Sequence, residues 1–569
     1  MITRFSIVTL LLFILSIALV IRPISIPIRL PLLGKRRIPI NLTTTPPTII
    51  VILWASQCLG PTQFEEHDFC ETPQPNPHIP DGVKPYNILI LFCSLAYMAI
   101  TLDITGILQA AAFWVSNKGG SNGWKLYIYF YLMLTSLTVF MGNDPVILSG
   151  TVFLVYYTTA TELEPMPWLI SEFAAANTAS MVLFVGNITN VVVCEGFAIN
   201  NVAFTAYTIF PFLACCVACF LALAIQFRDK KHIPPRLRAT ERLDPKSVLR
   251  DPEGAIVGSL FFGTCLVVII IVSFFKIDVW KISLPFAVAK LVFDFSWDHY
   301  RFVTGKLPRR NLSPSSSEDS SADTGVDPMD LQTQQAMTMA TDGPHCQEVI
   351  SSNAHSPIIA STALKNTEKS PPSPPSKSEL SEQIENRPYT RRHLQLTHAR
   401  LAAHFPTFFT ALPRLPLALV PFAFSQFILI EALQHQGWID VFARWLAIAS
   451  QGQIQSSIWL IGVIGVLMCN VSGTNIGATI LLAKVVRAAP NFTPESTRAA
   501  GIALAVASNI GAVSFTFSAS LAGLLWQTIL LQKGIDIRQT QFAFWNFLPI
   551  VFMTGAGMAI VSAEMAILY

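Results

Sequence analysis

The sequence contains few charged residues. Lys, Arg, Asp and Glu make up 13% of the 569 residues, whereas 52% of the residues are hydrophobic and the mean hydropathy is +0.50. Soluble globular proteins carry about 25% charged residues, so this composition excludes a soluble chain. The formal net charge of +3 does not indicate an electrostatic surface for nucleic acid, and we expect no nucleic-acid partner.

Motifs of catalysis and of metal binding are also missing. The ten cysteines lack the spacing of zinc ligands, and no nucleotide-binding loop or nucleophile–base motif occurs. We therefore expect no enzyme, no cofactor and no metal site. Cys215, Cys216 and Cys219 lie together in an apolar stretch. We interpret them as small packing residues, with a thiolate site for a soft metalloid as the alternative.

Long apolar stretches dominate the sequence instead. A span of a bilayer needs about 17–25 predominantly apolar residues, and ten stretches reach or approach that length, which predicts an integral, multi-pass protein in contact with lipid. The first is interpreted as a retained span, because Arg22 and Arg29 follow it in place of a small-residue cleavage site. The ten stretches are 5–21, 47–60, 86–115, 168–194, 202–225, 255–275, 282–295, 405–433, 499–524 and 542–568.

Two further apolar blocks, 126–159 and 457–488, are interpreted as re-entrant hairpins. Cytoplasmic loops are rich in Lys and Arg, which places the basic segments 22–41 and 226–253 inside and the acidic segment 60–83 outside. If successive spans cross the membrane in opposite directions, residues 297–404 lie in the cytoplasm. The first hairpin then enters the membrane from the inside and the second from the outside. The predicted fold is therefore an all-α polytopic membrane protein with two inverted repeats, each containing a re-entrant hairpin and a broken helix.

The predicted division of the chain follows from these assignments. Residues 1–84 form N-terminal spans and an outer loop, 85–226 the first repeat, 227–296 a basic loop with two connecting spans, and 405–569 the second repeat. Residues 297–404 are rich in Ser, Pro and Thr and lack apolar periodicity, so we expect them to be disordered. That segment is interpreted as a plain tether or as a phosphorylated regulatory segment.

The strongest functional signal is a pair of polar interruptions that occur at matching places in the two halves. Asn143 and Asn475 are 332 residues apart, and Asn177 and Asn509 are separated by the same number. Broken helices at corresponding positions of two halves indicate the binding site of a secondary transporter. The residues we predict to bind substrate or ion are Asn143, Asp144, Asn177, Gly186, Asn187, Asn190, Ser472, Thr474, Asn475, Asn509, Ser518 and Ser520.

Physical reasons connect these interruptions to binding. Irregular backbone inside hydrocarbon persists only around a protected polar cavity, and the N-terminus of a half-helix directs N–H groups toward a ligand. A single asparagine would be interpreted as an interhelical hydrogen bond, but two equivalent pairs favour a site. Asp144 is the candidate for proton coupling, because ionisable residues within a membrane are costly and usually functional. We expect Asp103 and Glu431 to form structural pairs.

At these motifs the sequence resembles the ion transporter superfamily, specifically its arsenite permease branch (the arsenical pump membrane proteins). Residues 516–526, followed by 532–537, are similar to a signature of that branch, and residues 143–190 are similar to its Asn-Asp hairpin tip and its Gly-Asn-Pro-x-Asn element. Ile188 and Ala519 depart from that pattern. The resemblance implies two inverted repeats, hairpins that move past a scaffold, and often a homodimer. The superfamily also contains citrate or dicarboxylate carriers and sodium/proton antiporters.

No arginine lies within either interruption, which favours a neutral hydroxylated or weakly charged substrate. The leading hypothesis is proton-coupled efflux of arsenite or a similar small species by an elevator-type mechanism. The alternatives are a citrate or dicarboxylate carrier coupled to Na⁺ or H⁺, or a Na⁺/H⁺ antiporter, on the same scaffold. A hypothesis of another class is a membrane receptor that uses the central loop as its output. The resident membrane is expected to be the plasma membrane or an endomembrane.

Overall fold

The computed structural model describes residues 3–30, 34–58, 84–237, 243–275, 277–306, 389–417 and 419–569. The N-terminal part consists of helix α1 (Arg4–Ile21), strands β1 (Ile24–Leu30) and β2 (Gly34–Ile40), and helix α2 (Thr45–Ala55). The strands form an antiparallel hairpin in which Ile24 pairs with Ile40. From the sequence, this segment is assigned by its basic charge, and no strands are predicted there. Isoleucine at every second position from Ile24 to Ile28 is the pattern that favours a strand.

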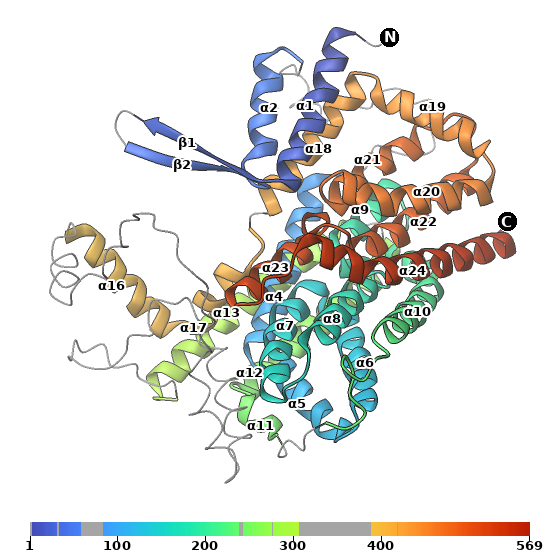
Figure 1. Cartoon of the computed structure of the whole chain (residues 1–569). Coiled ribbons are helices and arrows are strands. Elements are labelled where there is room, and N and C mark those ends of the chain that lie inside the picture. The colour runs from blue at the N-terminus through green and yellow to red at the C-terminus, as the bar shows by residue number, and fades with distance from the viewer. Residues whose placement is uncertain are drawn as a thin grey trace, which may run out of the picture.

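Two series of eight elements with the same order make up most of the remaining structure. Both contain two helices, a helical hairpin, a helix, a 3-10 turn and two further helices (Figure 1). The first series is α4 (Pro85–Ile104), α5 (Ile107–Gly119), α6 (Gly123–Met141), α7 (Asn143–Ala160), α8 (Pro165–Ala179), η1 (Phe184–Gly186), α9 (Ile188–Gly196) and α10 (Asn201–Gln226). The second is α18 (Leu419–His435), α19 (Trp438–Ser450), α20 (Ile454–Val471), α21 (Asn475–Arg487), α22 (Pro494–Ala512), η4 (Phe517–Ala519), α23 (Leu521–Gln532) and α24 (Gln539–Leu568).

The backbone of the two series also matches at the joints. Gly106 and Gly437 separate the first two helices of each series, and both have left-handed φ values of +89° and +77°. Gly142 and Gly473 occupy the two hairpin turns, and φ is +81° at both. Glycine adopts such angles without the steric cost that other residues meet. The two halves are therefore repeats in local structure as well as in sequence.

Several predicted spans are broken in the structure. The stretch 86–115 divides at Gly106, where an added Cβ would lie 2.2 Å from the carbonyl oxygen of Val248. The neighbouring carbonyl of Thr105 accepts a hydrogen bond from the amide of Arg250 (2.9 Å). The stretches 168–194 and 499–524 divide around the turns η1 and η4. Each break is thus placed by a glycine or by a polar residue that can satisfy the freed backbone groups.

Connecting elements lie between the two repeats. They are α11 (Pro245–Val248), α12 (Pro252–Val272), η2 (Ser273–Phe275), α13 (Trp280–Val303), α16 (Tyr389–His404), α17 (Pro406–Ala411) and η3 (Leu412–Arg414). The predicted disordered segment 297–404 is wrong at both ends, because α13 continues to Val303 and α16 occupies residues 389–404. At the end of α13, Asp298 is 1% exposed and Arg301 is paired with Asp251, so this part of the predicted loop is a helix that packs against the rest of the protein. Residues 307–388 lie outside the described part of the chain.

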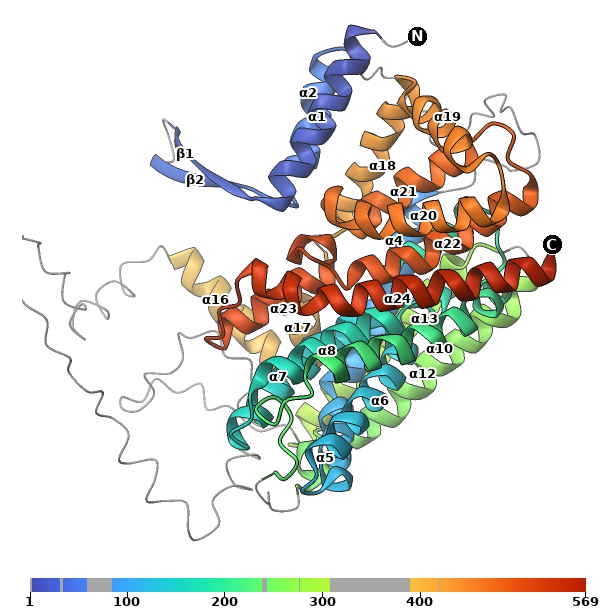
Figure 2. The same cartoon turned by 45° about the vertical axis from the view of Figure 1, so that its right-hand side comes forward.

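The helix pairs that flank the repeats are exchanged between them. Helices α12 and α13 precede the second repeat in sequence, yet they pack against α4, the first helix of the first repeat. Helices α1 and α2 come at the start of the chain, but they pack against α18, the first helix of the second repeat. Figure 2 shows α1 and α2 beside α18 at one end of the molecule, and α12 and α13 beside α4. Helices α10 and α24, which close the two repeats, pack against each other.

Seven of the described helices are long and apolar enough to cross a membrane: α1, α4, α6, α10, α12, α20 and α24. Large apolar side chains cover their outer faces; on α12, Ile256 and Leu260 are 70% and 67% exposed. In water such surfaces would be unfavourable, whereas lipid solvates them. The chain is therefore an integral, multi-pass membrane protein, as the sequence predicts.

Candidate functional site

The turn of the first hairpin carries two of the predicted site residues. Helix α7 begins at Asn143, so that Asp144 lies in its first turn beside Pro145. A carboxylate is favourable at that position because it faces the positive end of the helix dipole. Asn143 donates from Nδ2 to Oδ1 of Asn177 on α8 (3.3 Å). The predicted pair Asn143 and Asn177 is therefore in direct contact.

A small cavity opens beside this turn. Its volume is about 40 Å³, which accommodates a few water molecules. Asn143 and Asp144 contribute the polar part of its lining, and no hydrogen bond or ion pair joins Asp144 to another residue of the described chain. The opposite wall is apolar and comes from α4 and α12, namely Phe92, Leu95, Ala96 and Phe262.

Side chains of the two broken helices form one hydrogen-bonded group, here called the carboxamide network. Asn509 on α22 accepts at Oδ1 from Ser180 Oγ (3.0 Å) and from Asn187 Nδ2 (3.1 Å). Its Nδ2 donates to Asn190 Oδ1 (2.7 Å) and to the carbonyl oxygen of Ala505 (2.9 Å). Ser180 Oγ also lies 2.8 Å from the carbonyl oxygen of Asn177. The network thus connects Asn143, through Asn177 and Ser180, to the second repeat.

Asn509 has no remaining hydrogen-bonding capacity. A carboxamide offers two donor and two acceptor positions, and the four contacts above use all of them. Its side chain is completely buried. The structure therefore places Asn509 within the predicted site but assigns its carboxamide to holding the two repeats together.

The turn of the second hairpin differs from the first. Ser472 Oγ contacts the carbonyl oxygens of Met468 (2.7 Å) and Thr474 (3.0 Å), and Thr474 Oγ1 caps α21 by accepting from the amide of Gly477 (3.2 Å). Asn475 is only 4% exposed, and within the described chain its carboxamide has no hydrogen bond. Asn475 is thus the one of the four paired asparagines that the structure leaves outside the carboxamide network.

The other predicted residues support the breaks. Asn187 and Ser520 are the N-cap residues of α9 and α23, where they accept from the amides of Thr189 (3.3 Å) and Gly523 (3.0 Å). Gly186 is required at its position, because an added Cβ would lie 2.3 Å from the carbonyl oxygen of Ser180. The hydroxyl of Ser518 is buried and has no partner.

Sequence reasoning missed three polar residues near these breaks. Ser180 belongs to the carboxamide network, and Asn470 on α20 accepts from the amides of Phe515 (2.8 Å) and Thr516 (3.3 Å). Gln426 on α18 is 2% exposed, and among the described residues its Oε1 has no hydrogen-bond partner. Ser180 directly follows the first interruption and is the only one of the three that the pattern could have indicated.

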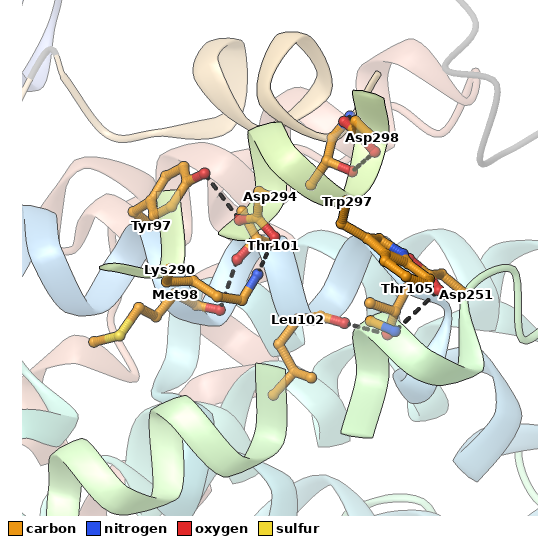
Figure 3. A network of polar contacts seen from close by, with 12 residues as sticks. Tyr97, Met98, Thr101, Leu102, Thr105, Asp251, Lys290, Asp294, Trp297 and Asp298 are labelled. Atoms are coloured by element: carbon orange, nitrogen blue, oxygen red, sulfur yellow. Dashed lines mark hydrogen bonds and ion pairs between the residues drawn. The ribbon is translucent and has the colours of Figure 1, made fainter. Parts of the chain in front are cut away.

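A second group of polar contacts contains buried charges and joins α4, α13 and the residues before α12 (Figure 3). On α13, Lys290 is ion-paired with Asp294, which also accepts from the hydroxyl of Tyr97 on α4 (2.9 Å). At the end of α13, Trp297 and Arg301 donate to Asp251 Oδ2 (2.9 and 3.1 Å), just before α12. Lys290 and Asp294 are 1% and 5% exposed. These contacts, with those of Asp298 to Thr407 (2.9 and 3.0 Å), hold α4, α12, α13 and α17 together.

Asp103 and Glu431 form pairs that match between the repeats. Asp103 at the end of α4 accepts from Ser149 on the hairpin helix α7 and lies 3.6 Å from Arg414. Glu431 on α18 accepts from Lys484 on the hairpin helix α21 (2.6 Å). Both contacts connect the first helix of a repeat to the returning helix of its hairpin. The sequence predicts that both residues pair at an interface between the repeats; the structure shows both paired, but within their own repeats.

The cysteines of α10 are packing residues in the structure. Cys215 contacts the carbonyl oxygen of Met553 (Sγ–O 3.5 Å), and the carbonyl of Cys216 accepts from Tyr131 (2.8 Å). Within the described residues, no three or more His, Cys, Asp or Glu side chains are grouped so that they could hold a metal ion.

Comparison with known proteins gives the family. The model of the citrate transporter family matches residues 3–303, which are 301 of the 569 residues. The chain belongs to the citrate transporter family. This membership agrees with the resemblance to the ion transporter superfamily and excludes the enzyme class.

Members of the arsenical pump group are similar to this citrate transporter family chain. The present chain is 24% identical over 208 residues to an arsenical pump membrane protein of Escherichia coli, and the match covers 35% of this chain and 47% of that protein. The corresponding protein of Yersinia enterocolitica is 24% identical over 196 residues, covering 34% and 44%. The chain spans about half the length of these curated relatives.

Two solved structures are similar over nearly the whole length. The YdaH transporter of Alcanivorax borkumensis covers 100% of this chain and 99% of its own, with a TM-score of 0.34. MtrF of Neisseria gonorrhoeae, an antimetabolite efflux pump, covers 98% and 93%, with a TM-score of 0.40. Both are 12% identical, and at this distance neither bears on the function of the present chain.

Proposed function

We propose that this member of the citrate transporter family is a secondary active transporter of a small, oxygen-rich weak acid. The observation that carries the proposal is the meeting of a hairpin turn with two broken helices. Asn143 contacts Asn177, and the carboxamide network continues through Ser180 to Asn509 in the other repeat. A network of buried polar side chains that joins both repeats is the arrangement expected of a transporter whose site lies at the repeat interface.

Asp144 is the proposed coupling residue. Its carboxylate lines the cavity at the first hairpin turn and has no ion pair or hydrogen bond among the described residues. An unpaired carboxylate in a membrane is costly, and protonation or binding of a cation would neutralise it. Uptake of a proton by Asp144 would therefore be linked to the movement of the hairpin through the membrane.

Efflux of arsenite, or of a similar undissociated oxyacid, is the first candidate activity. The polar side chains around both hairpin turns are carboxamides and hydroxyls together with the single carboxylate of Asp144. Such groups form hydrogen bonds with the hydroxyls of a neutral acid but supply no positive side chain for a multiply charged anion. The similarity to arsenical pump membrane proteins supports this candidate.

Transport of citrate or a dicarboxylate is the second candidate, and the family match favours it. Helices α7 and α21 begin at the hairpin turns, and α9 and α23 begin at the breaks. The N-terminus of a helix binds carboxylates through its free N–H groups and its dipole. A carboxylate site at these positions would therefore need no arginine.

The proposed movement is that of an elevator formed by two inverted repeats. The hairpins and broken helices would move together, because the carboxamide network joins them. The buried charges on α13 support a rigid body on the other side, since they are paired or hydrogen-bonded to Tyr97 of α4, to Asp251 before α12 and to Thr407 of α17. The apolar wall of Phe92, Leu95 and Phe262 would then be the surface past which the first hairpin moves.

The test is transport by the purified protein in proteoliposomes. Fluxes of arsenite, citrate and ²²Na⁺ are measured with and without an imposed pH gradient. Arsenite flux driven by the pH gradient supports the first candidate, and citrate flux supports the second. Absence of flux for all three probes in both conditions contradicts the proposal of a transporter for these classes of substrate.

A further inference from the structure

The two hairpin turns have different chemical surroundings. The first faces the apolar wall of the cavity, in which Leu95 of α4 takes part, and contains the carboxylate of Asp144. Gly106 and Gly437, which follow α4 and α18, are 331 residues apart, and at that separation Leu95 of α4 corresponds to Gln426 of α18. A leucine at the first turn is thus replaced by a hydrogen-bonding side chain at the second.

Gln426 faces the beginning of α21. If Gly477, in the first turn of that helix, carried a Cβ, this atom would lie 3.2 Å from Oε1 of Gln426 and 3.6 Å from its Cδ. The glycine therefore gives the carboxamide room to approach the helix. Gln426 is 2% exposed and its Oε1 accepts no hydrogen bond. A buried carbonyl without a donor is unfavourable, so this oxygen is a vacant acceptor beside the second turn.

Other unused polar groups surround the same turn. The amides of Asn475 and Ile476 belong to the first turn of α21, where N–H groups have no partner within the helix. Asn475 also has a free carboxamide. The hydroxyls of Thr516 and Ser518 are buried without partners, and the amide of Thr516 is held at the end of α20 by Asn470 (3.3 Å).

Contacts of α1 also bring these segments to one place. An added Cβ at Gly473 would lie 3.3 Å from Cγ1 of Val20, and α1 also contacts η4, which contains Ser518. Helix α1 therefore contacts both the hairpin turn and the second break, and Asn470, two residues before Ser472, accepts from the amides of Phe515 and Thr516 just before η4. Groups from α18, α21 and η4 consequently converge on the second turn.

We propose that Gln426 makes the second hairpin turn, which carries three of the predicted binding residues, selective for acids that carry a hydroxyl group. The N–H groups at the start of α21 attract an electron-rich oxygen of the acid. Oε1 of Gln426 accepts a hydrogen bond from its O–H, which an acid without a hydroxyl cannot donate. The second turn thus takes a hydroxycarboxylate or an undissociated oxyacid, and Asp144 at the first turn is left to the coupling ion. The inference rests on the proposed transport function.

The test compares pairs of probes that differ in one hydroxyl group. Citrate is measured against tricarballylate, and malate against succinate, as competitors and as transported species in proteoliposomes. The wild-type protein is expected to prefer the hydroxylated member of each pair at least tenfold, because loss of one hydrogen bond to a buried acceptor leaves that acceptor unsatisfied. Arsenite serves as the probe for an undissociated oxyacid.

Gln426→Leu is expected to reduce this preference about tenfold, chiefly through a higher KM for the hydroxylated acid, whereas Gln426→Glu retains an acceptor and part of the preference. Thermal stability of Gln426→Leu should equal or exceed that of the wild type, because the variant removes an unsatisfied buried oxygen. Gln109→Leu is the matched control. Gln109 is 4% exposed and its Oε1 is also unpartnered, but it lies on α5 of the other repeat.

Two results overturn the inference. One is an unchanged hydroxyl preference in Gln426→Leu, and the other is a wild-type protein that transports both members of each pair equally. In either case, flux that depends on the pH gradient and is lost in Asp144→Asn leaves the proposed function standing. Absence of flux and of competition for every probe removes the proposed function together with this inference.

Discussion

At the scale of single residues, asparagines that look equivalent in the sequence have different roles. Asn509 uses all four hydrogen-bonding positions within the protein, whereas Asn475, at a similar depth, uses none of its carboxamide positions among the described residues. A saturated carboxamide contributes to the stability of the fold, and an open one is available to a ligand. The two residues should therefore respond differently to the same substitution.

Asn509→Ala is expected to destabilise the protein by about 3 kcal/mol, because it leaves the partners Ser180, Asn187 and Asn190 partly unsatisfied in a buried region. Asn475→Ala should change stability by less than about 1 kcal/mol and should raise the KM of transport instead. Thermal unfolding in detergent and flux in proteoliposomes measure the two effects. Equal stability losses for both variants would show that the distinction between saturated and open carboxamides is wrong.

Asp144→Asn should abolish transport that is driven by a pH gradient, because the neutral carboxamide cannot bind and release a proton. The protein should still be inserted and folded, since no described residue depends on the carboxylate for an ion pair. Asp440→Asn is the matched control, since Asp440 also lies in the first turn of a helix, α19, but is exposed. Gradient-driven flux that persists in Asp144→Asn at the wild-type rate removes this residue from the coupling mechanism.

At the scale of elements, helix α13 shows how a charged helix is accommodated in a membrane protein. Its buried face carries Ser283, Ala287, Lys290, Asp294 and Asp298, while Val288 and Val292 on another face are about half exposed, at 49% and 59%. Charges inside a low-dielectric region are tolerated when they are paired and hydrogen-bonded. The ion pair between Lys290 and Asp294, with the hydroxyl of Tyr97, meets that condition.

Lys290→Met and Asp294→Leu are each expected to destabilise the protein by about 3–5 kcal/mol, because each leaves a buried charge without its partner. The double variant should recover most of that loss, since both charges are removed together. A double-mutant cycle by thermal unfolding in detergent measures the coupling. Lys281→Met is the control: its pair with Asp278 (2.8 Å) is exposed and should contribute at most about 1 kcal/mol. Additive losses in the double variant would contradict the proposed pairing.

At the scale of the whole molecule, the exchanged helix pairs make the repeats interdependent. Helices α1 and α2 support α18, and α12 and α13 support α4, so neither repeat is supported by the helix pair that precedes it in sequence. The central part of the chain connects α13 to α16, and α17 returns to Asp298 through Thr407. The contact between α13 and α17 is thus made by described residues on either side of residues 307–388.

Replacement of residues 310–386 by a flexible Gly/Ser linker of the same length should leave the rate of transport within about twofold of the wild type. The physical reason is that the ion pairs and hydrogen bonds around α13 and α17 remain in place. Flux in proteoliposomes is the measurement, with the Asp144→Asn variant as the inactive reference. Complete loss of flux in a folded linker variant would favour the alternative in which the central segment regulates or transmits a signal.

Hydropathy, glycine and asparagine in the sequence were sufficient to predict a membrane protein with paired hairpins and broken helices. These are local properties: bilayer span depends on a run of apolar residues, and a turn depends on the φ angles that Gly142 and Gly473 adopt. The 332-residue spacing then identified the repeats without knowledge of any contact.

Only the tertiary structure decided which polar groups are satisfied and which are free. The saturation of Asn509, the open Oε1 of Gln426 beside Gly477, and the inward position of Lys290 each depend on residues far away in sequence. The exchange of α1 and α2 with α12 and α13 is likewise a matter of packing. The physical reason is that hydrogen bonds and ion pairs between helices require a specific approach of two surfaces, which composition and periodicity of a single helix do not specify.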